Sequence, residues 1–271
     1  MASYLSTIQD LQATDGRFSL PIHSTEAGTN PNVSVNFGNK NPAGDDSIDH
    51  GVTKAPYECA FSPYEFNGGT TIAISGEDWA LVAADTRLSS GYEILSRNTT
   101  KLHPLTDGCV LGSAGCKTDV DQLRSVLDIK MKIYSHNHRK KMTTPSAAQM
   151  LGNTLYMRRF FPYYAFNVLA GIDGEGKGAV YSYDAVGSFE RTPFSANGSG
   201  QSYLIPLMDN LITHKHRNDE RQPLSKEEVV EIVKDAFVTA GERDIYTGDA
   251  VEIMIITKDG IEKSTFQLKA D

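Results

Sequence analysis

Hydrophobic and polar positions divide the chain into two parts of different character. Residues 1–60 are rich in Asn, Gly, Asp, Ser and Thr and hold few large apolar residues. Such a segment cannot bury enough apolar surface to offset the entropy that it would lose on ordering. We therefore expect a mobile, leader-like segment over residues 1–60 and a folded domain over residues 61–271.

The folded part is predicted to begin as a sheet. Residues 70–74 and 79–84 alternate or run apolar, and the polar residues 75–78 between them favour a tight turn. A third strand is expected at residues 109–113, directly after a turn at residues 106–108. These strands precede any helical pattern.

Two helices are predicted after Gly115. The first has an apolar stripe at helical spacing, at Val120, Leu123, Leu127 and Tyr134. The second starts at Thr144-Pro145, where proline suits the first helical turn.

The remaining elements repeat this order. Strands return at residues 166–170 and 178–183, and a helix follows over residues 204–212. Ser225-Lys226-Glu227-Glu228 is a capping box that opens a fourth helix, and two strands at residues 251–256 and 264–268 close the chain. The order predicts an α+β fold and permits two facing sheets, each covered outside by a helix pair.

Composition narrows the function. The hydrophobic share of 39% is ordinary for a globular protein, and the net charge of −8 argues against nucleic acid as a partner. The cysteines Cys59, Cys109 and Cys116 form neither a disulfide framework nor zinc-site spacing, which indicates a reducing compartment. With no signal-peptide pattern and no long apolar run, we expect a soluble intracellular protein without a membrane partner.

Other candidate sites have simpler explanations. The glycines of residues 171–176 lie between two predicted strands, so they indicate a hairpin turn rather than a phosphate-binding loop. Four histidines near charged helix ends are interpreted as surface residues, not metal ligands: His136, His138, His214 and His216. We expect neither a metal nor a cofactor.

A set of short motifs, spread along the chain, is informative when taken together. It comprises Gly68-Gly69-Thr70-Thr71, Ala83–Arg87, Lys101, Gly112–Gly115, Gly198-Ser199-Gly200 and Arg243–Asp249. In this order the motifs resemble the beta-type subunits of the 20S proteasome, and the resemblance runs from about Phe61 to Asp271. Three further segments are similar to the type numbered six in fungi and one in animals: Arg159–Tyr164, Gly176–Asp184 and Val186–Arg191.

The resemblance implies a fold and a set of partners. The fold would be the four-layer αββα sandwich of N-terminal nucleophile hydrolases, in agreement with the predicted element order. The partners would be other beta and alpha subunits in a stack of four seven-membered rings, twenty-eight subunits in all, together with assembly chaperones. The location would be the cytoplasm and the nucleus, and the task ATP- and ubiquitin-dependent protein degradation.

The resemblance also implies that this subunit is silent. Active members expose a threonine whose hydroxyl is the nucleophile and whose amine is the base. They carry an aspartate sixteen and a lysine thirty-two residues after it, and counting back from Asp85 and from Lys101 reaches Gly69 both times. Glycine has no side chain with which to attack.

The other pocket positions of active members are matched. By resemblance they are Asp85, Lys101, Ser199 and Asp244, with Gly115 as the oxyanion donor and Thr247 in place of a serine. A buried Lys–Asp pair is costly to break, so these residues could persist for stability alone. We therefore expect a non-catalytic structural subunit.

Two alternatives remain. Thr70 could be the nucleophile after cleavage at Gly69–Thr70, although side chains on a strand alternate faces and a shift of one residue would turn its hydroxyl away from Lys101. The chain could also be a free-standing hydrolase or binding domain. We further expect the leader to be trimmed upstream of Gly69, near Ala60-Phe61, by active neighbours.

Overall fold

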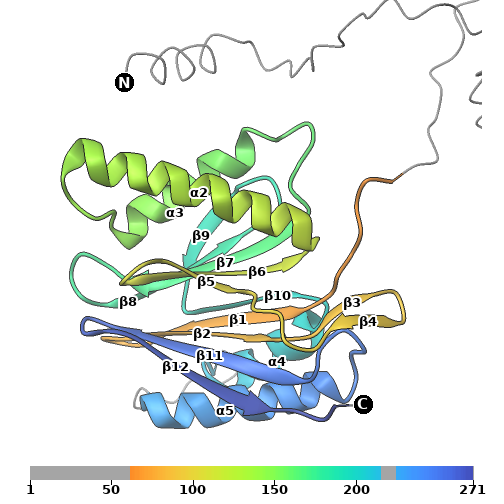
Figure 1. Ribbon diagram of the computed structural model, residues 1–271. Coiled ribbons are helices and arrows are strands. Elements are labelled where there is room, and N and C mark those ends of the chain that lie inside the picture. The colour runs from red at the N-terminus through yellow and green to blue at the C-terminus, as the bar shows by residue number, and fades with distance from the viewer. Residues whose placement is uncertain (1–61, 215–223, 271) are drawn as a thin grey trace, which may run out of the picture. The chain divides into compact units, whose positions relative to one another are not determined.

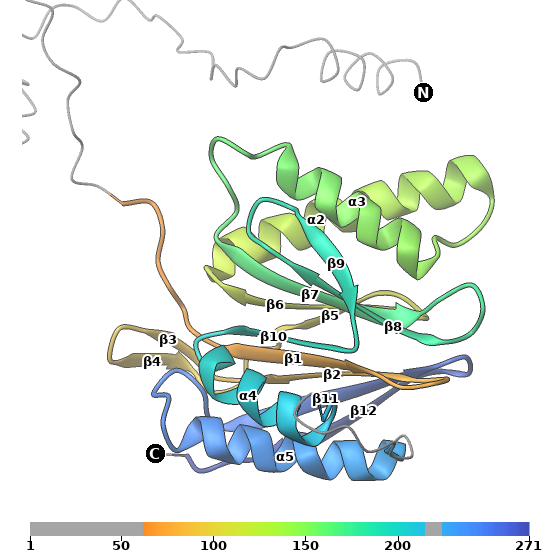
Figure 2. The same ribbon diagram turned by 180° about the vertical axis from the view of Figure 1, so that it is seen from behind.

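The computed structural model describes residues 62–214 and 224–270, so the expected leader over residues 1–60 lies outside the described residues. Two five-stranded antiparallel sheets lie face to face, and a helix pair covers the outer face of each (Figures 1 and 2). The predicted four-layer αββα sandwich is confirmed.

The first sheet has the strand order β10-β1-β2-β11-β12. Its strands are β1 (Thr70–Ser75), β2 (Ala80–Asp85), β10 (Phe194–Gly198), β11 (Ala250–Thr257) and β12 (Gly260–Gln267). β1 is central to the site, because it pairs with β10 from Thr70 opposite Gly198 and with β2 from Thr71 opposite Ala84.

The second sheet has the order β5-β6-β7-β8-β9. Its strands are β5 (Leu102–Thr106), β6 (Cys109–Gly115), β7 (Ala165–Ile172), β8 (Gly178–Tyr183) and β9 (Phe189–Thr192). A separate two-stranded hairpin, β3 (Leu88–Ser90) and β4 (Glu93–Ser96), projects beside the entry to β1 (Figure 1).

The helices form the two outer layers. α2 (Lys117–His138) and α3 (Thr144–Tyr156) cover the second sheet, while α4 (Gln201–Leu211) and α5 (Lys226–Gly241) cover the first (Figure 2). The predicted stripe of α2 is buried at Val120, Leu123 and Leu127. The predicted capping box is present at the start of α5, where Ser225 and Glu228 bond reciprocally.

Small side chains let the two sheets approach closely. The core between the sheets is built from residues such as Ala73, Val82, Val110 and Ala170. A Cβ atom at Gly112 would lie 3.0 Å from Val168 and 3.3 Å from Val82, so a larger residue there would push the layers apart. The two sheets therefore hold the strand ends that meet at the site in fixed positions.

Five strands were not predicted from the hydrophobic pattern: β3, β4, β5, β9 and β10. Their burial is mixed, β5 contains Pro104, and the register shifts within both the β3–β4 and the β5–β6 pairs. β10 has the polar sequence FSANG but is placed by its pairing with β1. Tertiary pairing, not local propensity, determines these strands.

Candidate functional site

The site is built around the backbone of Gly68, Gly69 and Thr70, where the chain enters β1. Gly68 and Gly69 have φ angles of +71° and +91°, a region that L-amino acids other than glycine rarely adopt. A Cβ atom built on Gly69 would lie 2.1 Å from Cε of Lys101. Residue 69 therefore faces Lys101, and the lysine side chain fills the space that a side chain at residue 69 would need.

Lys101 and Asp85 form a buried pair. Nζ of Lys101 lies 3.1 Å from Oδ1 of Asp85, and the two side chains are 5% and 0% exposed. Nζ also donates to the carbonyl oxygens of Asp85, at 2.8 Å, and of Arg87, at 2.7 Å. These three acceptors match the three donors of an ammonium group, so the lysine has little freedom to move.

Asp85 accepts several further hydrogen bonds. Its donors are the backbone N–H groups of Thr70 at 2.8 Å, Arg87 at 3.3 Å and Gly248 at 3.4 Å. Burial raises the pKa of Asp85 and lowers the pKa of Lys101, while the opposite charge of each partner acts against that shift. The charged forms of Asp85 and Lys101 therefore depend on each other for stabilisation, because both side chains are buried away from water.

The hydroxyl of Thr70 points into a different network. Its Oγ1 lies 2.7 Å from Oγ1 of Thr247 and accepts a hydrogen bond from the N–H of Gly200 at 2.9 Å. Thr247 in turn donates to Oδ2 of Asp244 at 2.7 Å, so Thr70 must be the donor to Thr247. The hydroxyl proton of Thr70 therefore belongs to a chain of hydrogen bonds that ends at Asp244 and not at the amine of Lys101.

Ser199 and Gly115 hold the carbonyl groups on either side of this entry. Ser199 donates to the carbonyl oxygen of Gly69 from its N–H at 3.0 Å and from Oγ at 3.4 Å. The N–H of Gly115 donates to the carbonyl oxygen of Gly68 at 3.4 Å. The structure thus brings together all seven positions selected from the sequence: Gly69, Asp85, Lys101, Gly115, Ser199, Asp244 and Thr247.

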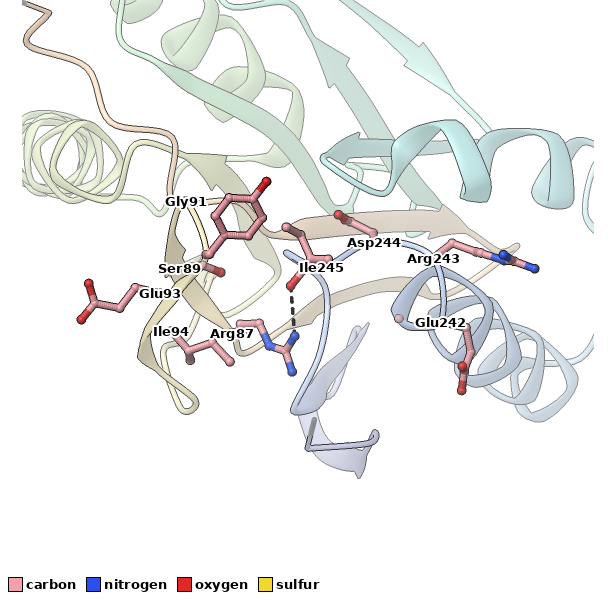
Figure 3. Close-up of a pocket in the computed structure, with 11 residues that line it drawn as sticks. Arg87, Ser89, Gly91, Glu93, Ile94, Glu242, Arg243, Asp244 and Ile245 are labelled. Carbon is pink, nitrogen blue, oxygen red and sulfur yellow. Dashed lines mark hydrogen bonds between the residues drawn. The ribbon is translucent and has the colours of Figure 1, made fainter.

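Little open space remains beside these residues. The cavity lined by Gly68, Lys101 and Gly115 has a volume of about 10 Å³, which is roughly the minimum for one water molecule. A larger hollow of about 390 Å³ lies between the β3–β4 hairpin and the chain after α5, where Arg87 donates to the carbonyl oxygen of Ile245 at 3.0 Å (Figure 3).

The sequence reasoning missed two features of this region. Arg87 forms a buried salt bridge with Asp249, at 2.9 Å, which ties the end of β2 to the start of β11. Asn67 is buried and contacts residues from two separate elements. The only local signal for Asn67 is a single polar residue between an aromatic residue and a glycine pair, which is too common to be diagnostic.

The structure also places several residues of the other candidate sites. In residues 62–214 and 224–270, no group of three or more His, Cys, Asp or Glu side chains could hold a metal ion. Glycines 174 and 176 lie in the turn between β7 and β8, and His216 lies outside the described residues. Among the described helices, none is long and apolar enough to cross a membrane.

Comparison with known proteins decides the family. Residues 65–256 match the family described as "Proteasome subunit". The chain belongs to the proteasome subunit family. The beta-type assignment made from the sequence motifs is confirmed, and so is the fold of the N-terminal nucleophile hydrolases.

Named relatives of this proteasome subunit match 78% of its chain. "Proteasome subunit beta type-1" of Drosophila melanogaster is 53% identical over 78% of this chain and 91% of its own length. The protein of the same name from Arabidopsis thaliana is 51% identical over 78% of this chain and 97% of its own length. "Probable proteasome subunit beta type-6" of Schizosaccharomyces pombe is 41% identical over 78% of this chain and 98% of its own length.

Proposed function

We propose that this chain is a non-catalytic structural subunit in the beta ring of the 20S proteasome core. It would contribute to assembly and help to wall the chamber in which the complex degrades proteins in an ATP- and ubiquitin-dependent manner. Its partners would be beta and alpha neighbours in the stack of four rings, and assembly chaperones, in the cytoplasm and the nucleus. Residues 61–271 would form the subunit domain and residues 1–60 its leader.

The observation that carries the proposal is the relationship of residue 69 to the buried pair. Gly69 faces Lys101, so the position that the family uses for its nucleophile holds no hydroxyl. The groups around it could stabilise a developing charge, but without a nucleophile they form no acyl intermediate. The seven positions would then be a vestigial pocket retained for packing and for the buried pair.

The contacts of Gly115 and Thr70 add support. By family resemblance, the N–H of Gly115 would be the oxyanion donor, yet it bonds to the chain's own Gly68 carbonyl. The Thr70 hydroxyl, which the rival hypothesis needs as nucleophile, is fully buried and donates toward Thr247. Its backbone N–H bonds to Asp85, so Thr70 sits in the strand as an ordinary internal residue.

Labelling of the native particle tests this function. Particles purified from cells are treated with a threonine-directed epoxyketone, and every beta subunit is mapped by mass spectrometry. We expect adducts on the catalytic beta subunits, which serve as the internal control, and none on this chain. An adduct on Thr70 would show that the subunit is an active protease.

Native mass measurement tests the third hypothesis, a free-standing domain. We expect this chain in cell extract to be found in the mass range of the assembled particle and its precursors. A stable monomer as the main species would contradict obligate assembly.

A further inference from the structure

Residues 64–68 lie between two elements of the same chain. One wall is β3 of the projecting hairpin, represented by Ser89, and the other is the end of β6 with the start of α2, represented by Gly115 and Lys117. A segment that lies between two such edges and exchanges backbone hydrogen bonds with both is bound in the manner of an added strand.

Asn67 contacts both walls with its backbone. Its N–H donates to the carbonyl oxygen of Gly115 at 3.2 Å, and its carbonyl oxygen accepts from the N–H of Ser89 at 3.2 Å. The next residue continues the pairing, because the carbonyl oxygen of Gly68 accepts from the N–H of Gly115. These contacts are the ones that any extended peptide could make.

The side chain of Asn67 repeats the same bridge. Its Nδ2 donates to the carbonyl oxygen of Ser89 at 3.1 Å, and its Oδ1 accepts from the N–H of Lys117 at 2.9 Å. An amide is the neutral side-chain group that supplies a donor nitrogen and an acceptor oxygen on the same carbon atom. Because Asn67 is only 7% exposed, loss of either partner would leave a buried polar group unsatisfied.

Aromatic residues hold the same segment farther upstream. The ring of Phe66 packs edge-on against Tyr164 at 6.0 Å and against Tyr246 at 5.7 Å. Tyr64 stacks on Phe161 at 5.5 Å and donates from its hydroxyl to the carbonyl oxygen of Pro162 at 2.9 Å. Tyr64 and Phe66 alternate with Asn67, as expected for extended backbone in a cleft.

We propose that residues 62–69 are a built-in occupant of the chain's own peptide cleft, locked in place by Asn67. The segment closes the cleft to peptides from the chamber, and the cavity of about 10 Å³ beside Gly68 is what remains of it. Asn67 is a positioning residue whose four hydrogen bonds join β3 to β6 and α2. The inference deepens the proposed function, because it gives a second reason, independent of the missing nucleophile, why the site is silent.

Hydrogen exchange on the intact particle tests the closure directly. In the wild type, peptides covering residues 64–69 should exchange more slowly than an unstructured peptide, since the N–H of Asn67 is hydrogen-bonded and residues 67–69 are buried. Exchange of this segment at the rate of an unstructured peptide, with the segment still present in the mature chain, would overturn the inference. That result would leave the proposed non-catalytic function standing, whereas an epoxyketone adduct on Thr70 would remove both.

Variants at Asn67 test the lock. Asn67→Ala removes both side-chain bonds and should speed exchange of the segment by about tenfold, and it should open the segment to cleavage by added thermolysin. Asn67→Asp keeps an acceptor for Lys117 but loses the donor to Ser89, so its effect should be intermediate.

Ser62→Ala, in the exposed part of the same segment, is the matched control and should behave as the wild type. If Asn67→Ala exchanges like this control, Asn67 is no lock and the inference is wrong. If Asn67→Ala does not assemble, the wild-type measurement decides alone.

Discussion

Gly69 and Lys101 compete for one space, since a Cβ atom at residue 69 would lie 2.1 Å from Cε of the lysine. The lysine cannot easily withdraw, because its Nζ is held by Asp85 and by two carbonyl groups in a buried environment. The absence of a side chain at residue 69 and the position of the Lys101 side chain are therefore adjusted to each other. A hydroxyl-bearing side chain at residue 69 is therefore not sufficient to restore a nucleophile.

We predict that Gly69→Thr does not restore a nucleophile. The φ angle of +91° strains any L-amino acid, and the added side chain must displace Lys101, so the folded chain should lose about 1–3 kcal/mol or more of stability. Denaturant unfolding measures the loss, and epoxyketone labelling of the assembled particle should remain negative. Gly174→Ala is the control, because a Cβ atom there meets open space. A stable, labelled Gly69→Thr subunit would contradict this account.

The buried Lys101–Asp85 pair should behave as a coupled unit. Lys101→Met or Asp85→Asn alone leaves one buried charge without its partner and should lower the free energy of unfolding by about 3–5 kcal/mol. The double variant should lose clearly less than the sum of the two single losses. The free energies of unfolding of the wild type, the two single variants and the double variant are compared in a double-mutant cycle. Lys132→Met is the matched control, because Lys132 and Asp128 form an exposed pair at 2.7 Å, worth about 1 kcal/mol at most. Additive losses at Lys101 and Asp85 would refute the coupling.

His103 should make the fold less stable in mild acid. The imidazole is 3% exposed, its Nε2 has no hydrogen-bond partner among the described residues, and burial, with Arg124 and Lys117 nearby, lowers its pKa from 6.5 to about 4. Asp121 and Glu252 act in the opposite direction but do not cancel the shift. In the unfolded chain His103 therefore becomes protonated below about pH 6.5, whereas in the folded chain it becomes protonated only near pH 4.

The sign follows from this difference in bound protons. The contribution of neutral His103 to the free energy of unfolding is fully present above pH 6.5 and falls as the pH drops toward 4, by about 3 kcal/mol at most. Unfolding free energies of the wild type and of His103→Leu, measured across this range, isolate the histidine from the carboxylates that also titrate. Parallel pH profiles for the two proteins would contradict the assignment.

The mature N-terminus should lie upstream of residues 62–69. Under the proposed function the chain has no nucleophile of its own, so active neighbours would trim the leader, and they need an extended, accessible stretch of chain. Residues 64–69 are held in place by the contacts of Tyr64 and by the hydrogen bonds of Asn67, and residues 67–69 are buried. Sequencing of the assembled subunit should therefore find a start near Ala60-Phe61, which lies outside the described residues. A start at Gly69 or Thr70 would count against both the silent site and its closure.

Much of the fold could be predicted because its signals are local. The apolar stripe of α2, the proline at the start of α3 and the capping box at Ser225 each act within one or two turns of helix, and the structure confirms them. β10 could not be found in this way. Its polar sequence has no strand signal by itself, and it becomes a strand because β1, more than a hundred residues earlier, offers an edge with which to pair.

The sequence, with its family resemblance, determined which residue lies opposite Lys101. The spacing that active members show from the nucleophile to the aspartate and the lysine pointed to residue 69, and the alternation of side chains along a strand then directed Thr70 to the other side. Only the tertiary structure decided how the site is closed. The partners of Asn67 are backbone groups at Ser89, Gly115 and Lys117, and a backbone N–H or carbonyl has no identity in the sequence until the fold places it within reach.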